Sequence, residues 1–200
     1  QGPPSGGGVV LLTALNVLEP FNMNGFKENS SATYHLLAEA LRKGHHARSR
    51  YVGDPGFFDV PINELINKKH AQEYARQIEF NKATPASEVK PLEVIQESKD
   101  TTHYSIIDNE GNAVSNTYTL GYSFGSGVTI PGTGILMNNQ MNNFAFQYGD
   151  QTETSRSSSP GNRFIPGKRP MSTMNPVIVK NKDNNISIVT GSPGGSFIPA

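Results

Sequence analysis

The feature that most constrains the fold is a change of hydrophobic periodicity in the middle of the chain. Before residue 80, apolar residues recur at helical spacing. After residue 101 they lie in short segments that alternate with polar residues, as in strands. A polar segment with two prolines, residues 81–99, separates the two parts. The pattern predicts the α+β class, with a layer of helices packed on a layer of antiparallel strands.

The first half contains two long helical segments. Residues 9–18 form an apolar run long enough for a buried helix, which Pro20 ends. Ser30 or Ser31 is expected to cap an amphipathic helix that follows. Gly44 weakens this second helix, so it either continues or breaks there.

Two shorter helical segments are expected after Pro61 and over residues 71–78. Residues 81–99 then have few large apolar side chains and are expected to form an extended, solvated linker. A linker of this length inside a compact domain is unusual and indicates a function.

Two β-hairpins are expected in the second half. The first pairs residues 102–108 with 113–120 across an Asn- and Gly-containing turn, and the second pairs 177–180 with 186–190.

Composition excludes several classes of function. The 200 residues include 17 Lys and Arg against 17 Asp and Glu, so there is no excess of cations for a nucleic-acid backbone. The absence of Cys excludes disulfides, a thiol nucleophile and a Cys-based zinc site, and leaves a hydroxyl as the nucleophile. No run approaches the ~18 apolar residues of a membrane helix. The basic residues around His45 and His46, Arg48 among them, could form a metal or anion patch. Adjacent histidines point to different helix faces, so they are interpreted as a solvated helix end.

Thr101 lies where the linker meets the first predicted strand. A threonine hydroxyl needs a base, and the α-amino group of the same threonine serves once the preceding bond is cut. This amine titrates near ~7.7–8, which suits a base at neutral pH. Threonine is also an ordinary strand former, so this position alone leaves both interpretations open.

Gly194 and Gly195 follow a proline at the end of the last predicted strand. Adjacent backbone N–H groups without side chains can stabilise an oxyanion. A plain turn is the alternative, and a phosphate-binding loop is excluded because no Gly-Lys-[Ser/Thr] follows.

Blocks spaced along the whole chain resemble the γ-glutamyltransferase (γ-glutamyl transpeptidase, glutathione hydrolase) family. The blocks are residues 3–7, 38–40, 48–55, 101–105, 112–114, 117–120, 134–141, 168–174 and 190–196. The resemblance implies an N-terminal nucleophile hydrolase fold, a four-layer αββα sandwich that is incomplete in this chain. It further implies that residues 1–100 are the C-terminal part of a large subunit and residues 101–200 the N-terminal part of a small subunit.

The resemblance also implies an activity. A precursor cuts itself between Asp100 and Thr101, and its two subunits remain together as a heterodimer. Thr101 then accepts the γ-glutamyl group of glutathione or a similar donor and passes it to water or to an amino acid or peptide amine. We expect no cofactor, no metal, no nucleic-acid partner and no membrane span, and a periplasmic or extracellular location.

Site residues carry over by position from the family. Thr119 orients Thr101, and Gly194 and Gly195 supply the oxyanion donors. The expected substrate-binding residues are Gln140, Asn143, Ser172, Thr173 and Gly121. An arginine that binds the donor's α-carboxylate is expected before residue 1.

Two of these positions depart from the family pattern. Many relatives have Asn where this chain has Gly121, and Asn143 stands where relatives have an Asp that pairs with the donor's α-ammonium. Because charge-assisted hydrogen bonds are roughly twice as strong as neutral ones, Asn143 weakens selection for a free α-amine. An acylase acting on glutaryl or cephalosporin-type amides is therefore one alternative. An inactive fragment is another.

Overall fold

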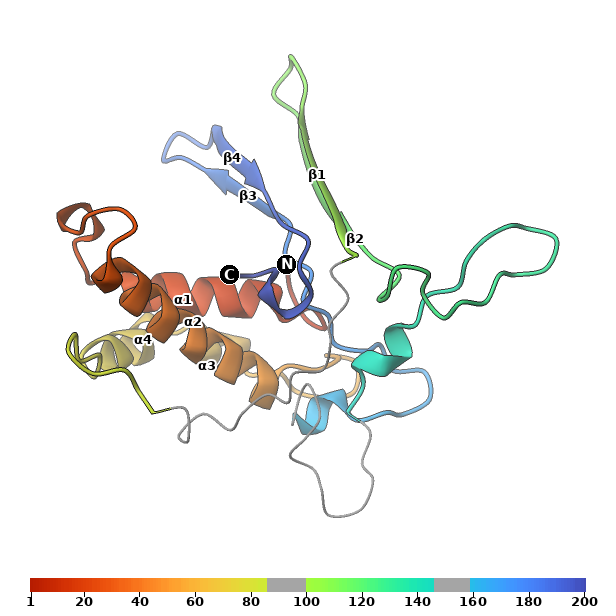
Figure 1. The fold of residues 1–200 in the computed structure, drawn as a ribbon, viewed down its shortest axis with the longest axis horizontal. Coiled ribbons are helices and arrows are strands. Elements are labelled where there is room, and N and C mark those ends of the chain that lie inside the picture. Colours follow the sequence, from red (N-terminus) through yellow and green to blue (C-terminus); the bar gives the residue numbers. More distant parts are fainter. Residues whose placement is uncertain (86–99, 146–158) are drawn as a thin grey trace.

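The structure is a computed structural model that describes residues 1–85, 100–145 and 159–200. Helices of the first half form one layer, and two β-hairpins of the second half project from it (Figure 1). Among the described residues, no helix is long and apolar enough to cross a membrane. Most of the predicted linker, residues 86–99, lies outside the described residues.

The helical layer is built on a close pair, α1 (Gly7–Leu18) and α2 (Ser31–Tyr51). Ser30 caps α2, since its side chain accepts a hydrogen bond from the backbone N–H of Thr33. The helix does not break at Gly44. A Cβ atom there would lie 2.5 Å from the carbonyl oxygen of Val10, so glycine permits the close approach of α1.

Two short helices complete this layer, α3 (Ile62–Leu65) and α4 (Lys68–Ala75). Small apolar side chains of α1, α2 and α4 form one buried cluster, which consists of Ala14, Val17, Ala40, Ala71 and Ala75. Small residues let the three helices pack closely, with little room for a large core.

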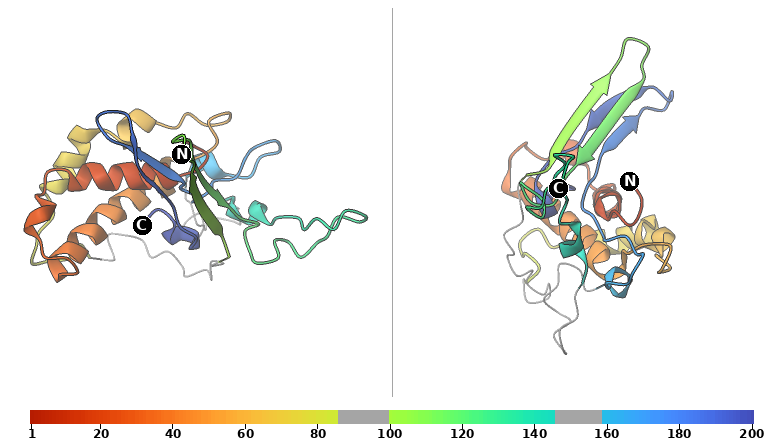
Figure 2. Two further views of the ribbon diagram at one scale, coloured as in Figure 1. Left: turned by 90° about the horizontal axis from the view of Figure 1, so that it is seen from above. Right: turned by 90° about the vertical axis from the view of Figure 1, so that its right-hand side faces the viewer.

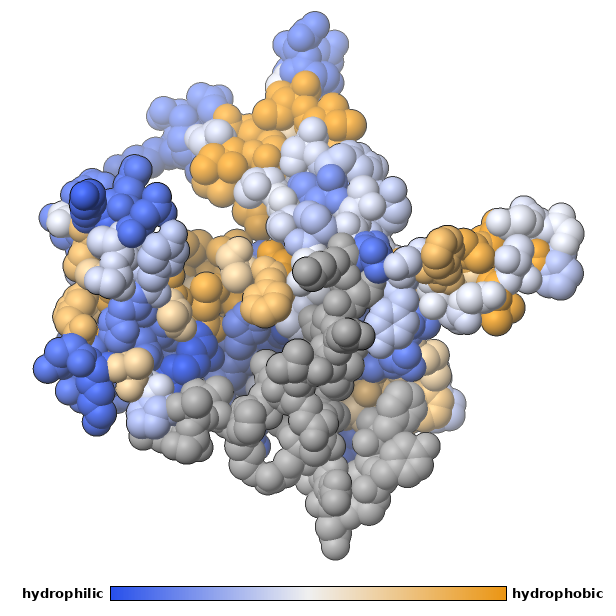
Figure 3. Space-filling model, viewed as in Figure 1, coloured by the Kyte–Doolittle hydropathy of each residue, from blue (hydrophilic) through white to orange (hydrophobic). Residues whose placement is uncertain are grey.

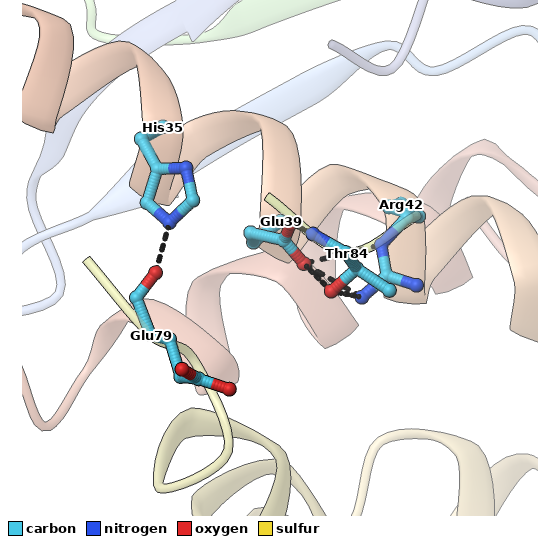
Figure 4. A network of polar contacts seen from close by, with 5 residues as sticks. All are labelled: His35, Glu39, Arg42, Glu79 and Thr84. Atoms are coloured by element: carbon cyan, nitrogen blue, oxygen red, sulfur yellow. Dashed lines mark hydrogen bonds and ion pairs between the residues drawn. The ribbon is translucent and has the colours of Figure 1, made fainter. Parts of the chain in front are cut away.

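Polar side chains of α2 hold the chain that follows α4 (Figure 4). His35 Nε2 donates to the carbonyl oxygen of Glu79 at 2.9 Å. The Glu39 carboxylate accepts from Arg42 Nη2 at 2.6 Å and from Thr84 N and Oγ1, both at 2.9 Å. Burial opposes ionisation of Glu39, but these hydrogen bonds outweigh it and lower its pKa. Thr84 is thereby fixed to α2 shortly before the chain leaves the described residues.

The two hairpins form separate two-stranded sheets. β1 (Thr102–Ile107) pairs antiparallel with β2 (Ala113–Tyr118), and β3 (Val177–Lys180) with β4 (Ile186–Thr190). They lie side by side in both views of Figure 2. Ser115 joins them, because its hydroxyl donates to the carbonyl oxygen of Thr190 and accepts from the N–H of Val177.

Apolar side chains of the hairpins are largely exposed, as the orange patches of Figure 3 show. Ile106, Val114 and Ile188 are each about half exposed although they lie on strands. The sheets of a sandwich would cover such faces, so the sandwich is incomplete within the described residues.

Residues 171–174 fasten the second half to the first. Gly6 N donates to the carbonyl oxygen of Ser172, and Ser172 N donates to that of Pro4, which makes a short parallel bridge. Met171 is buried in a cluster with Val9, Ala47 and Val52. The segment that carries Ser172 and Thr173 is therefore anchored to the helical layer.

Candidate active site

Thr101 lies directly before β1 and is nearly buried, with 9% of its surface exposed. The register of the first hairpin places Thr102 opposite Tyr118. Continued by one residue, this register sets Thr101 opposite Thr119, so the two threonines lie next to each other at the open end of the hairpin. Among the described residues, no side-chain hydrogen bond joins the two.

A pocket opens beside Thr101, and both halves of the chain line it. The lining residues come from α2, from the end of the first hairpin, and from three later segments. They are Arg48, Thr101, Thr119, Gly121, Tyr122, Asn139, Gln140, Asn142, Asn143, Met171, Ser172, Thr173, Met174, Gly195 and Ile198. Eight of the ten residues predicted from the sequence meet here; the exceptions are Asp100 and Gly194, which lie next to lining residues in the chain.

The turn after β2 is held by its own side chain. Thr119 Oγ1 accepts from the N–H of Gly121 at 2.9 Å. Gly121 has φ +95°, a conformation that favours glycine.

The backbone conformation at Gly194 and at Gly195 also favours glycine. Gly194 has φ +134° and Gly195 φ +59°. Gly195 begins the 3₁₀-helix Gly195–Phe197 and lines the pocket. A side chain at either position would be strained, so the sequence keeps this backbone bare beside the pocket.

Gln140 and Asn143 belong to a single 3₁₀ turn, Gln140–Asn143. Asn143 Nδ2 donates to Gln140 Oε1 at 2.6 Å. With that assignment, Gln140 keeps its amide nitrogen as a donor.

An ion pair fixes the segment that leads to Ser172 and Thr173. The Asp54 carboxylate accepts from the N–H of Arg169 at 2.8 Å, from Arg169 Nη2 at 2.6 Å and from the N–H of Gly56 at 3.1 Å. Asp54 is 2% exposed, whereas the Arg169 side chain is 63% exposed. The hydrogen bond from the Arg169 side chain is the main reason that the pKa of Asp54 lies far below its usual range; burial opposes this shift.

Asn162 connects two of the lining segments and was missed by the sequence analysis. It is 1% exposed, donates through Nδ2 to the carbonyl oxygen of Asn143 at 2.7 Å, and accepts through Oδ1 from the N–H of Met171 at 2.9 Å. One buried amide thus sets the spacing between the 3₁₀ turn and residues 171–174. A polar residue in an irregular segment gave no signal of this role.

The interpretation of Arg48 as part of a solvated helix end is wrong. Arg48 is 6% exposed and lines the pocket, and its side chain packs against Gly6. Its neighbour His46 has a lowered pKa, first through burial and then through the charges of Arg50, Lys43 and Arg42. The described residues hold no group of three His, Cys, Asp or Glu suited to a metal.

The described lining of the pocket contains few charged groups. Arg48 is the only charged residue among the described lining residues, and none of them is Asp or Glu. Hydroxyl and amide groups supply the remaining polar lining. The described lining therefore offers no carboxylate to a cation.

The sequence matches the family model described as Gamma-glutamyltranspeptidase over residues 1–200. The chain belongs to the gamma-glutamyltranspeptidase family. The predicted family is thereby confirmed. The chain is 44% identical over 197 residues to a protein named glutathione hydrolase proenzyme from Escherichia coli (strain K12). This match covers 98% of the chain and 34% of that protein.

Acylases are also similar to this chain. It is 38% identical over 192 residues to a protein named Acylase ACY 1 proenzyme from Pseudomonas sp. (strain SE83), covering 96% of the chain and 32% of that protein. The solved structure of cephalosporin acylase from Bacillus halodurans is also similar, with a TM-score of 0.74 and 27% identity. The match covers 99% of this chain and 32% of the acylase chain.

This structural likeness confirms the predicted fold class, an N-terminal nucleophile hydrolase fold of which the chain contains part. The chain spans about a third of the length of the curated relatives.

Proposed function

We propose that the protein is a self-cleaving γ-glutamyltransferase/hydrolase with Thr101 as its nucleophile. It transfers the γ-glutamyl group of glutathione or a related amide to water or to the amine of an amino acid or peptide. The observation that carries this proposal is the position of Thr101, which shares one pocket with all five predicted substrate-binding residues and with Gly195. No cofactor enters the reaction.

Maturation is an internal acyl transfer. Thr101 Oγ attacks the carbonyl carbon of Asp100, the peptide C–N bond breaks, and the freed nitrogen takes the hydroxyl proton. Water then hydrolyses the ester, which leaves a carboxylate on Asp100 and an α-amine on Thr101. Ser123 donates a hydrogen bond to the Asp100 side chain, which supports a fixed scissile bond.

Turnover uses the amine that maturation releases. The α-amine of Thr101 takes the proton from Oγ, which attacks the γ-carbonyl of the donor. The N–H groups of Gly194 and Gly195 stabilise the oxyanion, and Thr119 orients the nucleophile. The leaving amine departs with the proton, and water or an acceptor amine resolves the γ-glutamyl ester.

Two parts of one precursor form the working enzyme. Residues 1–100 belong to the large subunit and residues 101–200 to the small one, and their heterodimer is exported to the periplasm or outside the cell.

A second function has specific support, hydrolysis of glutaryl or cephalosporin-type amides. Asn143 is neutral, and the described lining contains no carboxylate that would pair with an α-ammonium. Two of the similar proteins are named acylases. A glutaryl donor carries a terminal carboxylate without the ammonium group and therefore fits such a lining.

Thr101→Ala in the full-length protein tests the nucleophile, with Thr102→Ala as the matched control. Intact mass should show two subunits for the wild type and for the control, but one uncut chain for Thr101→Ala. Hydrolysis of γ-glutamyl and glutaryl p-nitroanilides should be lost in Thr101→Ala alone. Cleavage or turnover in that variant would remove Thr101 from the mechanism.

The same two anilides separate the candidate functions. A larger kcat/KM for the γ-glutamyl compound supports the transferase. An equal or larger kcat/KM for the glutaryl compound would favour the acylase over the transferase. Turnover of neither compound would favour the inactive alternative.

A further inference from the structure

At position 121 the side chain of Asn139 lies in the space that a side chain of residue 121 would take. A Cβ atom at Gly121 would lie 1.8 Å from Oδ1 of Asn139 and 3.0 Å from its Cγ. Asn139 is held against this turn by its backbone as well, since its N–H donates to the carbonyl oxygen of Leu120 at 2.9 Å. The amide of Asn139 thus stands where a side chain from residue 121 would otherwise enter the pocket.

The orientation of this amide follows from its partners. Asn139 Oδ1 accepts a hydrogen bond from the N–H of Tyr122 at 3.0 Å. An N–H donor requires the oxygen of the amide, which assigns the other atom as Nδ2. No described residue accepts a hydrogen bond from Nδ2. Asn139 is half-buried and lines the pocket, so its Nδ2 is available as a donor to a bound ligand.

The surroundings indicate the chemistry of that ligand. The side chains of Thr119, Ser172 and Thr173 can donate, and Gln140 keeps its amide nitrogen free of Asn143. Arg48 is the single formal charge of the described lining. A cluster of donors, without a carboxylate among the described lining residues, suits a carboxylate ligand.

The geometry points to Asn139 as a substrate-binding residue whose Nδ2 donates to a carboxylate of the acyl donor, in the space that glycine leaves at position 121. This inference rests on the proposed function, but it holds for either donor class. A γ-glutamyl donor carries its α-carboxylate, and a glutaryl donor its terminal carboxylate, at the end remote from the scissile amide.

Asn139→Asp separates this role from a purely structural one. The carboxylate keeps an oxygen for the N–H of Tyr122 and has almost the same size, but it replaces the donor with a negative oxygen. Asn138→Asp is the matched control. It makes the same chemical change one residue away, keeps the oxygen that accepts from Gln140 N, and does not alter the described pocket lining.

Binding of L-glutamate and of glutarate to the processed full-length protein is measured by calorimetry, so that turnover is not required. Asn139→Asp should lower the affinity for the ligand that the wild type binds by roughly 10- to 100-fold, which corresponds to the loss of a hydrogen bond to a charged group. Asn138→Asp should leave it within about two-fold of the wild type, as for an exposed substitution. Processing of both variants, followed by intact mass, should match the wild type.

Kinetics with an amidated donor complete the test. Asn139→Asp should raise the KM for γ-glutamyl or glutaryl p-nitroanilide. This increase should be smaller when the donor's carboxylate is replaced by a carboxamide. Unchanged affinity in Asn139→Asp, an equal loss in Asn138→Asp, or a wild type that binds neither carboxylate would overturn the inference. Binding of either ligand without turnover of any anilide would contradict the proposed function and leave the assignment of Asn139 standing.

Discussion

The ion pair of Asp54 and Arg169 gives a prediction whose size can be worked out. Asp54→Asn keeps the shape of the side chain but removes its charge and turns one acceptor into a donor. Either the N–H of Arg169, or Nη2 of Arg169 together with the N–H of Gly56, then faces an NH₂ group. Hydrogen bonds to charged groups contribute about 1.5–3 kcal/mol each.

The exposure of Arg169 reduces this total. Its side chain is 63% exposed, so the guanidinium regains water and its share of the pair is small. The backbone N–H groups lose an acceptor in a site where Asp54 is 2% exposed. We therefore expect a loss of about 2–4 kcal/mol in the free energy of unfolding at pH 7.

The pH dependence distinguishes this charge effect from a packing effect. The pKa of Asp54 is lowered in the folded state, so its stabilisation is fully present above the ordinary carboxyl pKa of about 4. It is lost progressively as the pH falls below that value. The difference between the wild type and Asp54→Asn should therefore shrink in acid.

Urea unfolding of the full-length protein between pH 3 and pH 7, followed by circular dichroism, measures this difference. Asp59→Asn is the matched control, because Asp59 is exposed and has no ion pair among the described residues. The reasoning fails if Asp54→Asn stays within about 0.5 kcal/mol of the wild type at pH 7. It also fails if the difference is constant with pH.

Two further predictions concern the pocket. Asn162→Ala leaves the N–H of Met171 and the carbonyl oxygen of Asn143 unpaired in a buried site, so we expect a loss of about 2–5 kcal/mol in unfolding free energy, measured in urea, and a raised KM for the donor. Asn143→Asp restores an anion beside Gln140, so the ratio of kcat/KM for γ-glutamyl over glutaryl p-nitroanilide should rise roughly ten-fold. An unchanged ratio would show that residue 143 does not select the α-ammonium.

Local signals account for the elements that the sequence predicted. The apolar run of α1, the cap at Ser30 and the alternation of both hairpins are short-range patterns, and the structure confirms each. The continuation of α2 through Gly44 was left open because propensity alone disfavours glycine in a helix. Contact with Val10 on α1 decides it, and such a contact between helices is not visible in a local pattern.

The residues of the candidate site also fall into those that the sequence predicted and those that it did not. Thr101, Gly195 and the residues of the 3₁₀ turn could be named because the family resemblance identifies positions one by one. Asn162, Asp54 and the burial of Arg48 depend on segments far apart in the chain, such as residues 54 and 169. Their roles follow from tertiary contacts, for which the spacing along the sequence carries no signal.

These distant contacts bear on the proposed maturation. Cleavage after Asp100 would remove the only covalent connection between residues 1–100 and 101–200 within this chain. The bridge between Gly6 and Ser172, the ion pair of Asp54 and Arg169, and the burial of Met171 among first-half residues do not involve that bond. Each lies on the segment that leads to Ser172 and Thr173. Under the proposed function, cleavage therefore frees the amine of Thr101 while the substrate-binding segment stays anchored to the helical layer.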